Sequence, residues 1–170
     1  CKKNTDPKPN NPGGGEQELI TRFELHFKNV ADTMDQFTFK FTDPEGEGKG
    51  SGPVTETINL NKGTAYDVEV KIFDDTKSPV VAVHEEIEEE SNYHRFHYTF
   101  TAAQATPNTG MAINITDIDK LTPPQPLGLN FSLVTGTVTG TGTLNVNLRH
   151  FDEGAAKSSD PNAGEQDVNI

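Results

Sequence analysis

Hydrophobic residues alternate with polar ones along most of this 170-residue chain, and this period of two constrains the fold more than any other feature. In the first such segment, Phe23, Leu25 and Phe27 are separated by polar residues. Successive side chains of a strand point to opposite faces, so each segment predicts a strand with one buried face. No segment sustains a helical period. The expected strands lie at about 19–28, 37–41, 54–60, 66–73, 79–88, 94–100, 111–115, 127–133, 144–150 and 167–170.

The connections between these segments favour an antiparallel sandwich. They are short and rich in Gly, Pro, Asn and Asp, and the Thr/Gly run 135–143 is typical of a hairpin. A turn ending at Gly63 and followed by Tyr66 resembles the tyrosine corner of immunoglobulin-like and fibronectin-like sandwiches. We therefore expect an all-β protein, an antiparallel immunoglobulin-like β-sandwich over residues 18–170.

The N-terminal segment predicts a lipidated tether over residues 1–17. Cys1 is the single cysteine, and the Pro/Asn/Gly-rich run that follows has almost nothing to bury. The alternative to lipidation is that trimming of a longer chain happened to leave a cysteine at residue 1. With no other cysteine, disulfides and zinc sites built from several thiolates are excluded.

The charge of the chain argues against nucleic acid as a partner. The formal net charge is −12, and no basic patch is visible in the sequence. Catalysis is the least supported class of function, because the sequence contains no nucleophile elbow and no phosphate loop. We therefore expect a protein that is not an enzyme.

Residues 79–100 carry three of the chain's five histidines and its densest cluster of carboxylates. If two strands formed a hairpin here, His84 and His97 could face each other on one outer surface with Glu86 alongside, and His94 would lie at the rim of the core. Imidazole and carboxylate ligands suit zinc or another divalent transition metal. The alternative is a solvated acidic edge, which would also prevent edge-to-edge strand pairing.

A second, weaker cation site is suggested near the C-terminal end of the sequence. Asp160, Asn162 and Asp167 place oxygen atoms around a loop with a central Gly, as calcium loops do. The spacing differs from that of the helix-loop-helix calcium motif, so an ordinary turn is the alternative.

Several features together resemble the outer-membrane lipoproteins of Bacteroidota. They are the Cys-Lys-Lys motif, the Pro/Gly tether, the all-β domain, the run Glu86–Glu90 followed by His94-Arg95-Phe96, and the segment Gly140–Phe151. The resemblance implies a covalent lipid on Cys1, attachment to the outer membrane, and accessory work beside a TonB-dependent β-barrel transporter. Such a protein could capture a metal; a structural subunit of another assembly or a surface adhesion module are the alternatives.

The same resemblance bears on modification and on location. Asp32-Thr33-Met34 is similar to the short motif at which these bacteria O-glycosylate exported proteins, which makes Thr33 a candidate site. Lys2 and Lys3 stand where surface-exported members usually carry acidic residues. Despite this departure from the family pattern, we expect the domain at the cell surface rather than at the periplasmic face of the outer membrane.

Overall fold

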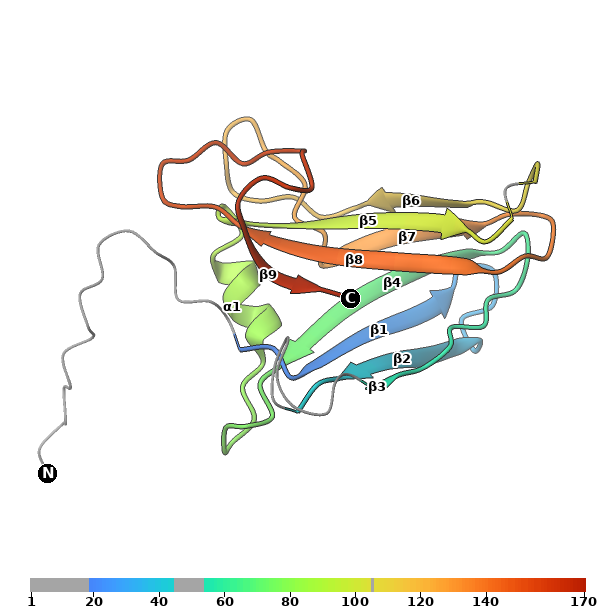
Figure 1. Cartoon of the computed structure of the whole chain (residues 1–170), viewed down its shortest axis with the longest axis horizontal. Coiled ribbons are helices and arrows are strands. Elements are labelled where there is room, and N and C mark those ends of the chain that lie inside the picture. Colours follow the sequence, from blue (N-terminus) through green and yellow to red (C-terminus); the bar gives the residue numbers. More distant parts are fainter. Residues whose placement is uncertain (1–18, 45–53, 105) are drawn as a thin grey trace, which may run out of the picture.

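Two antiparallel sheets pack face to face in the computed structural model, which describes residues 19–44, 54–104 and 106–170 (Figure 1). The larger sheet has the order β3-β2-β1-β4-β7-β6, and the smaller one has the order β5-β8-β9. The strands are β1 (Arg22–Asn29), β2 (Gln36–Thr42), β3 (Val54–Thr55), β4 (Ala65–Phe73), β5 (His94–Ala102), β6 (Met111–Ile115), β7 (Asn130–Thr135), β8 (Gly142–His150) and β9 (Glu165–Asn169). The prediction of an all-β antiparallel sandwich is confirmed, whereas the immunoglobulin-like subtype stays a prediction.

The alternating residues of both sheets meet in one hydrophobic core. Each sheet contributes one face of its central strands, as the period of two requires. The residues buried there include Phe23, Leu25, Phe27, Tyr66, Val68, Val70, Ile72, Phe96, Phe131, Leu133, Val146, Leu148 and Val168.

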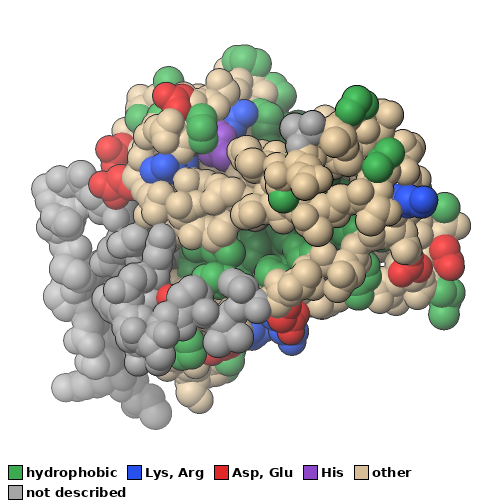
Figure 2. All heavy atoms as spheres, turned by 45° about the vertical axis from the view of Figure 1, so that its right-hand side comes forward, with side chains coloured by type: hydrophobic (Ala, Val, Ile, Leu, Met, Phe, Trp, Pro, Cys, Tyr) green, Lys and Arg blue, Asp and Glu red, His purple; other side chains and the backbone are tan. Residues whose placement is uncertain are grey.

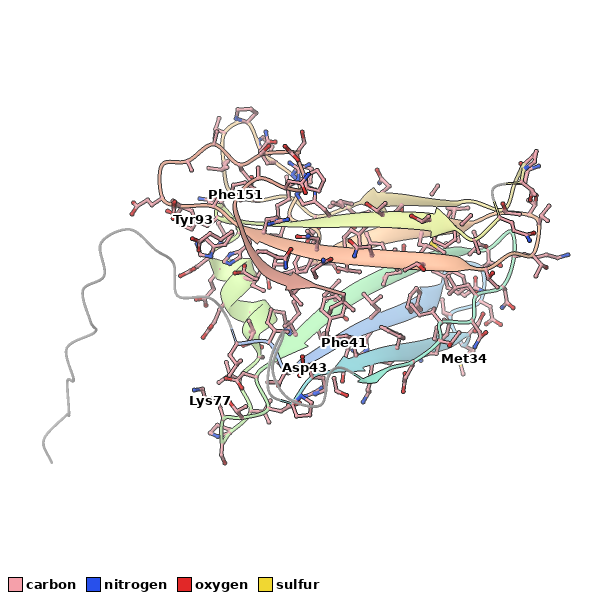
Figure 3. The ribbon with its side chains drawn as sticks, viewed as in Figure 1. Met34, Phe41, Asp43, Lys77, Tyr93 and Phe151 are labelled. Carbon is pink, nitrogen blue, oxygen red and sulfur yellow. The ribbon has the colours of Figure 1, made fainter. Side chains whose placement is uncertain are left out.

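The smaller sheet covers the larger one unevenly. Phe37, Phe39 and Phe41 on β2 belong to the core face but are only partly buried, because three strands lie opposite six. Figure 2 shows hydrophobic side chains in a hollow between the two layers, and Figure 3 places Phe41 at the β2 side of the molecule.

The contact expected at the tyrosine corner is present. The hydroxyl of Tyr66, which is 1% exposed, accepts a hydrogen bond of 3.0 Å from the backbone N–H of Asn61. Tyr66 thereby holds the turn that precedes β4, as the resemblance implies.

The prediction of a strand at 79–88 is wrong, because the chain forms a short helix, α1 (Val83–Glu89). Val83 and Ile87 are its buried residues. A spacing of four places two residues on one face of a helix and equally on one face of a strand, so this pair fits both structures. Glutamates favour the helix by propensity, and Glu85 and Glu86 lie in its first turn, where the helix dipole favours negative charge.

The Thr/Gly run at 135–143 is a crossover and not the expected hairpin. β7 lies in the six-stranded sheet and β8 in the three-stranded sheet, so the run passes from one layer to the other. No helix in the described part of the chain has the length and apolar character needed to cross a bilayer.

Candidate metal centre

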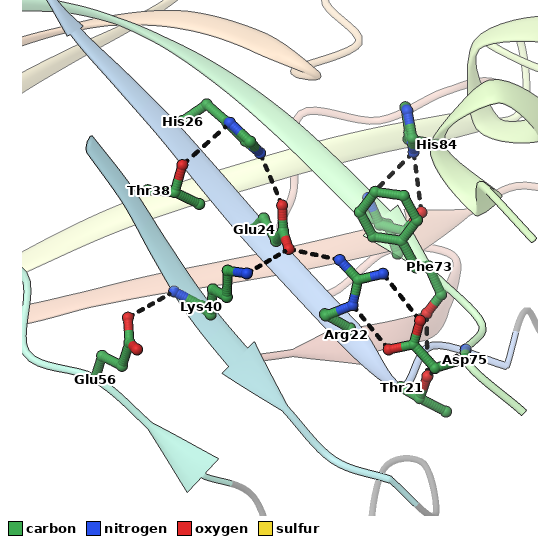
Figure 4. A network of polar contacts seen from close by, with 11 residues as sticks. Thr21, Arg22, Glu24, His26, Thr38, Lys40, Glu56, Phe73, Asp75 and His84 are labelled. Atoms are coloured by element: carbon green, nitrogen blue, oxygen red, sulfur yellow. Dashed lines mark hydrogen bonds and ion pairs between the residues drawn. The ribbon is translucent and has the colours of Figure 1, made fainter. Parts of the chain in front are cut away.

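His84 serves the edge of a strand and does not face the other predicted ligands. Its Nδ1 lies 2.9 Å from the backbone oxygen of Ile72 and 3.3 Å from the backbone nitrogen of the same residue (Figure 4). Its ring also packs edge-on against Phe73 at 5.2 Å between centroids. The imidazole therefore contacts the backbone polar groups of β4 beyond the last residue pair between β4 and β7.

Glu86 and His97 lie apart from His84 as well. Glu86 is exposed on α1, while His97 belongs to β5 in the other sheet. Burial lowers the pKa of His97, and the neighbouring Arg95 and Arg149 lower it further. Two guanidinium groups make this face unfavourable for a cation. The structure also does not bring His84, Glu86 and His97 together in one site.

His94 is the one member of the predicted set that joins a cluster. It begins β5 and sits directly opposite His150, the last residue of β8. Their ring centroids are 4.6 Å apart, with an angle of 67° between the ring planes. His94 is fully buried and His150 half-buried, so the pair closes one end of the smaller sheet.

A backbone contact fixes which nitrogen of His94 carries the proton. Nδ1 lies 3.2 Å from the carbonyl oxygen of Glu90, at the end of α1, and a carbonyl can only accept a hydrogen bond. The proton therefore belongs on Nδ1, and Nε2 keeps a lone pair. Nε2 is buried and has no hydrogen-bond partner among the described residues.

Asp167 reaches the two histidines from a bulge in β9. In the β8–β9 ladder Leu148 pairs with Val168 and Arg149 with Gln166, so the register shifts by one residue at Asp167. The bulge lets both Asp167 and Val168 face inward, where regular alternation would bury only one of them. The Oδ2 of Asp167 lies 3.8 Å from Nε2 of His94.

His94, His150 and Asp167 together form a candidate centre for a divalent transition metal. One ligand atom from each lies within 4.8 Å of the others. Zinc with ligands at about 2.0–2.2 Å would hold those atoms about 3.3–3.6 Å apart in a tetrahedral site, so atoms 4.8 Å apart would have to approach by about 1.2–1.5 Å. Two imidazoles and one carboxylate suit zinc-like ions, whereas calcium takes oxygen ligands.

The charge state of His94 also suits a ligand. Burial lowers its pKa to about 4; the hydrogen bond to the Glu90 carbonyl opposes this shift, while His150 and Lys157 add to it. A neutral imidazole whose other ring N–H is held by a backbone carbonyl is the usual form of a metal-binding histidine.

A buried ion pair lies close to this centre. The Nζ of Lys157 is 2.8 Å from Oδ2 of Asp119 and donates to the backbone oxygen of Ser91 at 2.8 Å. The side chains of Lys157 and Asp119 are 1% and 0% exposed. Figure 3 shows Tyr93 and Phe151 at the same end of the sandwich, where the Phe151 N–H bonds to the Tyr93 oxygen.

The structure does not bring the three residues of the expected calcium loop together. Asp160 and Asn162 are exposed, and the backbone N–H of Asn162 donates to Oδ1 of Asp160 at 2.9 Å. Their oxygen atoms therefore serve a turn, while Asp167 is buried beside His94.

The structure describes one of the two expected modification sites, Thr33. Thr33 is exposed in the turn between β1 and β2, which agrees with the predicted loop, and its glycosylation stays a prediction. Cys1 and the tether lie outside the described residues.

No family model, no curated protein and no solved structure matches this chain. The function therefore has to be argued from the geometry of the centre.

Proposed function

We propose that this protein captures a divalent transition metal, zinc or an ion of similar preference, through His94, His150 and Asp167. The observation that carries the proposal is the lone pair on Nε2 of His94, which is fully buried and faces a carboxylate oxygen 3.8 Å away. A buried polar atom without a partner is costly, and a bound cation would remove that cost.

Each ligand has a defined part in holding the ion. His94 offers Nε2 because its other nitrogen donates to Glu90, and Asp167 supplies the negative charge that offsets the ion. Three protein ligands leave one tetrahedral position for water or an exchangeable ligand. His150 is half-buried, so solvent reaches the centre from the side of this residue.

The proposal is tested by titrating zinc into tag-free protein in a calorimeter and repeating the titration with His150→Ala. Loss of an outer-shell partner alone costs about 10–100-fold in metal affinity, so loss of a ligand should weaken binding by at least about 100-fold. His97→Ala is the matched control, because it removes a partly buried histidine of the same sheet and should leave the affinity unchanged. Equal affinity of the wild-type protein and His150→Ala, or no binding by either, contradicts the proposal.

We further propose that the protein works as a lipid-anchored, non-catalytic accessory or binding subunit at the outer membrane, beside a TonB-dependent β-barrel transporter. The support is the resemblance set out above: the Cys-Lys-Lys motif, the Pro/Gly run and the all-β domain. An immunoglobulin-like sandwich at the cell surface belongs to the same proposal. A structural subunit of another outer-membrane assembly, or an adhesion module, is the competing role.

Gentle detergent extraction from native membranes, followed by mass spectrometry of the bound proteins, separates these roles. We expect the protein in the detergent phase with a transporter in stoichiometric amount, and Cys1→Ser should abolish the partition into detergent. Recovery with a different membrane assembly would favour the structural role. Recovery of wild-type protein from the aqueous phase alone would refute the anchor.

A further inference from the structure

We infer that an ion in the His94–His150–Asp167 centre acts as a clasp that fastens β9 to the rest of the three-stranded sheet. The inference rests on the proposed metal binding and adds a consequence for the molecule: the position of one strand depends on occupancy of the site. It follows from where the three ligands come from and from how unequally their strands are held.

Each ligand comes from a different strand of the smaller sheet. His94 is in β5, His150 in β8 and Asp167 in β9, and β8 lies between the other two. An ion bound by all three therefore links the outer strands of this sheet to each other as well as to the central one.

The strands are held with very different strength. β5 and β8 are joined by nine residue pairs in unbroken register from His94 to Ala102. β9 is joined to β8 by four residue pairs, which the bulge at Asp167 interrupts, and two backbone hydrogen bonds between Val146 and Ile170 follow directly after these pairs. In the described part of the chain β9 has no neighbouring strand on its other side.

Closing the site has to move Asp167 more than the histidines. The ligand atoms lie up to 4.8 Å apart and must approach to about 3.3–3.6 Å around zinc. His94 and His150 face each other in the long β5–β8 ladder and have little freedom to shift. Asp167 sits at a bulge in an edge strand, where the ladder is already broken, so the ion draws β9 inward.

Hydrogen–deuterium exchange of the whole chain tests the clasp. Metal-free protein is compared with protein in zinc at about 100 times its measured dissociation constant, where the ion binds nearly every folded molecule. We expect zinc to slow amide exchange in residues 166–170 by roughly tenfold or more, because exchange in an edge strand reports local opening. Exchange in the exposed turn 31–34 between β1 and β2, which also opens locally but lies in the other sheet, should stay the same. Amides of β1 that exchange through global unfolding are slowed by any ion that stabilises the folded protein, so they do not test the clasp.

Two variants, each saturated with zinc, distinguish the clasp from general stabilisation by a bound ion. In Asp167→Ala the ion can still contact both histidines but no longer reaches β9, so zinc should leave exchange in residues 166–170 unchanged. In His150→Ala the ion still joins His94 to Asp167, so zinc should continue to slow exchange there, at higher concentration.

The outcomes separate this inference from the function on which it rests. If calorimetry shows zinc binding while exchange in β9 stays the same, the clasp is refuted and metal capture stands. The clasp is equally refuted if zinc slows β9 in Asp167→Ala as much as in the wild-type protein. If the wild-type protein binds no zinc, both proposals fall.

Discussion

At the scale of single residues, Gly128 shows how closely the two layers approach each other. Its φ is +106°, and a Cβ placed on it would lie 2.6 Å from Cβ of Phe96, which is completely buried in β5. The hydroxyl of Tyr98 also donates to the Gly128 carbonyl at 2.5 Å. Position 128 therefore requires both a backbone conformation that glycine adopts readily and the absence of a side chain.

We predict that Gly128→Ala lowers the free energy of unfolding by at least about 2 kcal/mol, because it adds a steric clash to an unfavourable φ. Gly154→Ala is the matched control: its φ is +84°, but no atom lies within 4 Å of the added Cβ. It should cost only about 1 kcal/mol. Urea unfolding measures both, and equal losses would show that the contact with Phe96 contributes nothing.

The sequence already contained part of the metal centre at this scale. The period of two gives His94 the same parity as Phe96 and His150 the same parity as Leu148, which puts both histidines on the inward faces of their strands. What parity could not supply is the pairing of β5 with β8, which brings the two rings together, because pairing is a property of the whole sheet. Asp167 was also out of reach, since its inward direction depends on a bulge that breaks the period of two.

At the scale of elements, α1 marks the limit of reading strands from alternation. Val83 and Ile87 fit the period of two and the helical spacing equally well, and the segment is only seven residues long. Two buried residues that lie four apart cannot decide between the two, whereas in β1 the buried Phe23, Leu25 and Phe27 follow at spacings of two, which only a strand places on one face.

The connections between elements are fastened by the buried Lys157–Asp119 pair. Lys157, in the loop after β8, bonds to Asp119, in the segment between β6 and β7, and to Ser91 after α1. Burial alone would raise the pKa of Asp119, but the hydrogen bonds from Gln125, Lys157 and Leu121 outweigh it and the pKa is lowered. Burial lowers the pKa of Lys157, since the loss of hydration exceeds the attraction of Asp119.

We predict that Asp119→Asn lowers the free energy of unfolding at pH 7 by about 3 kcal/mol, because it leaves the Lys157 ammonium buried without its counter-charge. A carboxylate whose pKa is depressed by folding stabilises the protein above its unfolded value of about 3.9, and this contribution is lost as the pH falls through the folded value. The difference between the wild-type protein and the variant should therefore be constant above about pH 5 and shrink below about pH 4.

Urea unfolding at a series of pH values measures this difference. Asp152→Asn, which changes an exposed aspartate of the same loop, is the control and should alter stability by less than about 0.5 kcal/mol. A difference between the wild-type protein and Asp119→Asn that stays constant down to pH 3 would exclude Asp119 as the titrating group.

At the scale of the whole molecule, the division into six strands and three is what the sequence did not reveal. The Thr/Gly run between β7 and β8 has the composition of a hairpin turn, yet it carries the chain to the other layer. Turn composition reports local backbone freedom and not which strands pair. The class of the fold follows from alternation, while its strand order depends on contacts between segments far apart in the chain.

The separation of the three ligands along the chain has a consequence for how the protein would acquire its ion. Residues 94, 150 and 167 meet only when β5, β8 and β9 have assembled, and an unfolded chain rarely offers a preformed metal site. A chain that crosses a membrane unfolded would therefore carry no zinc with it, and loading would follow folding. At the envelope location proposed above, the metal supply outside the cytoplasm would set how many molecules are occupied.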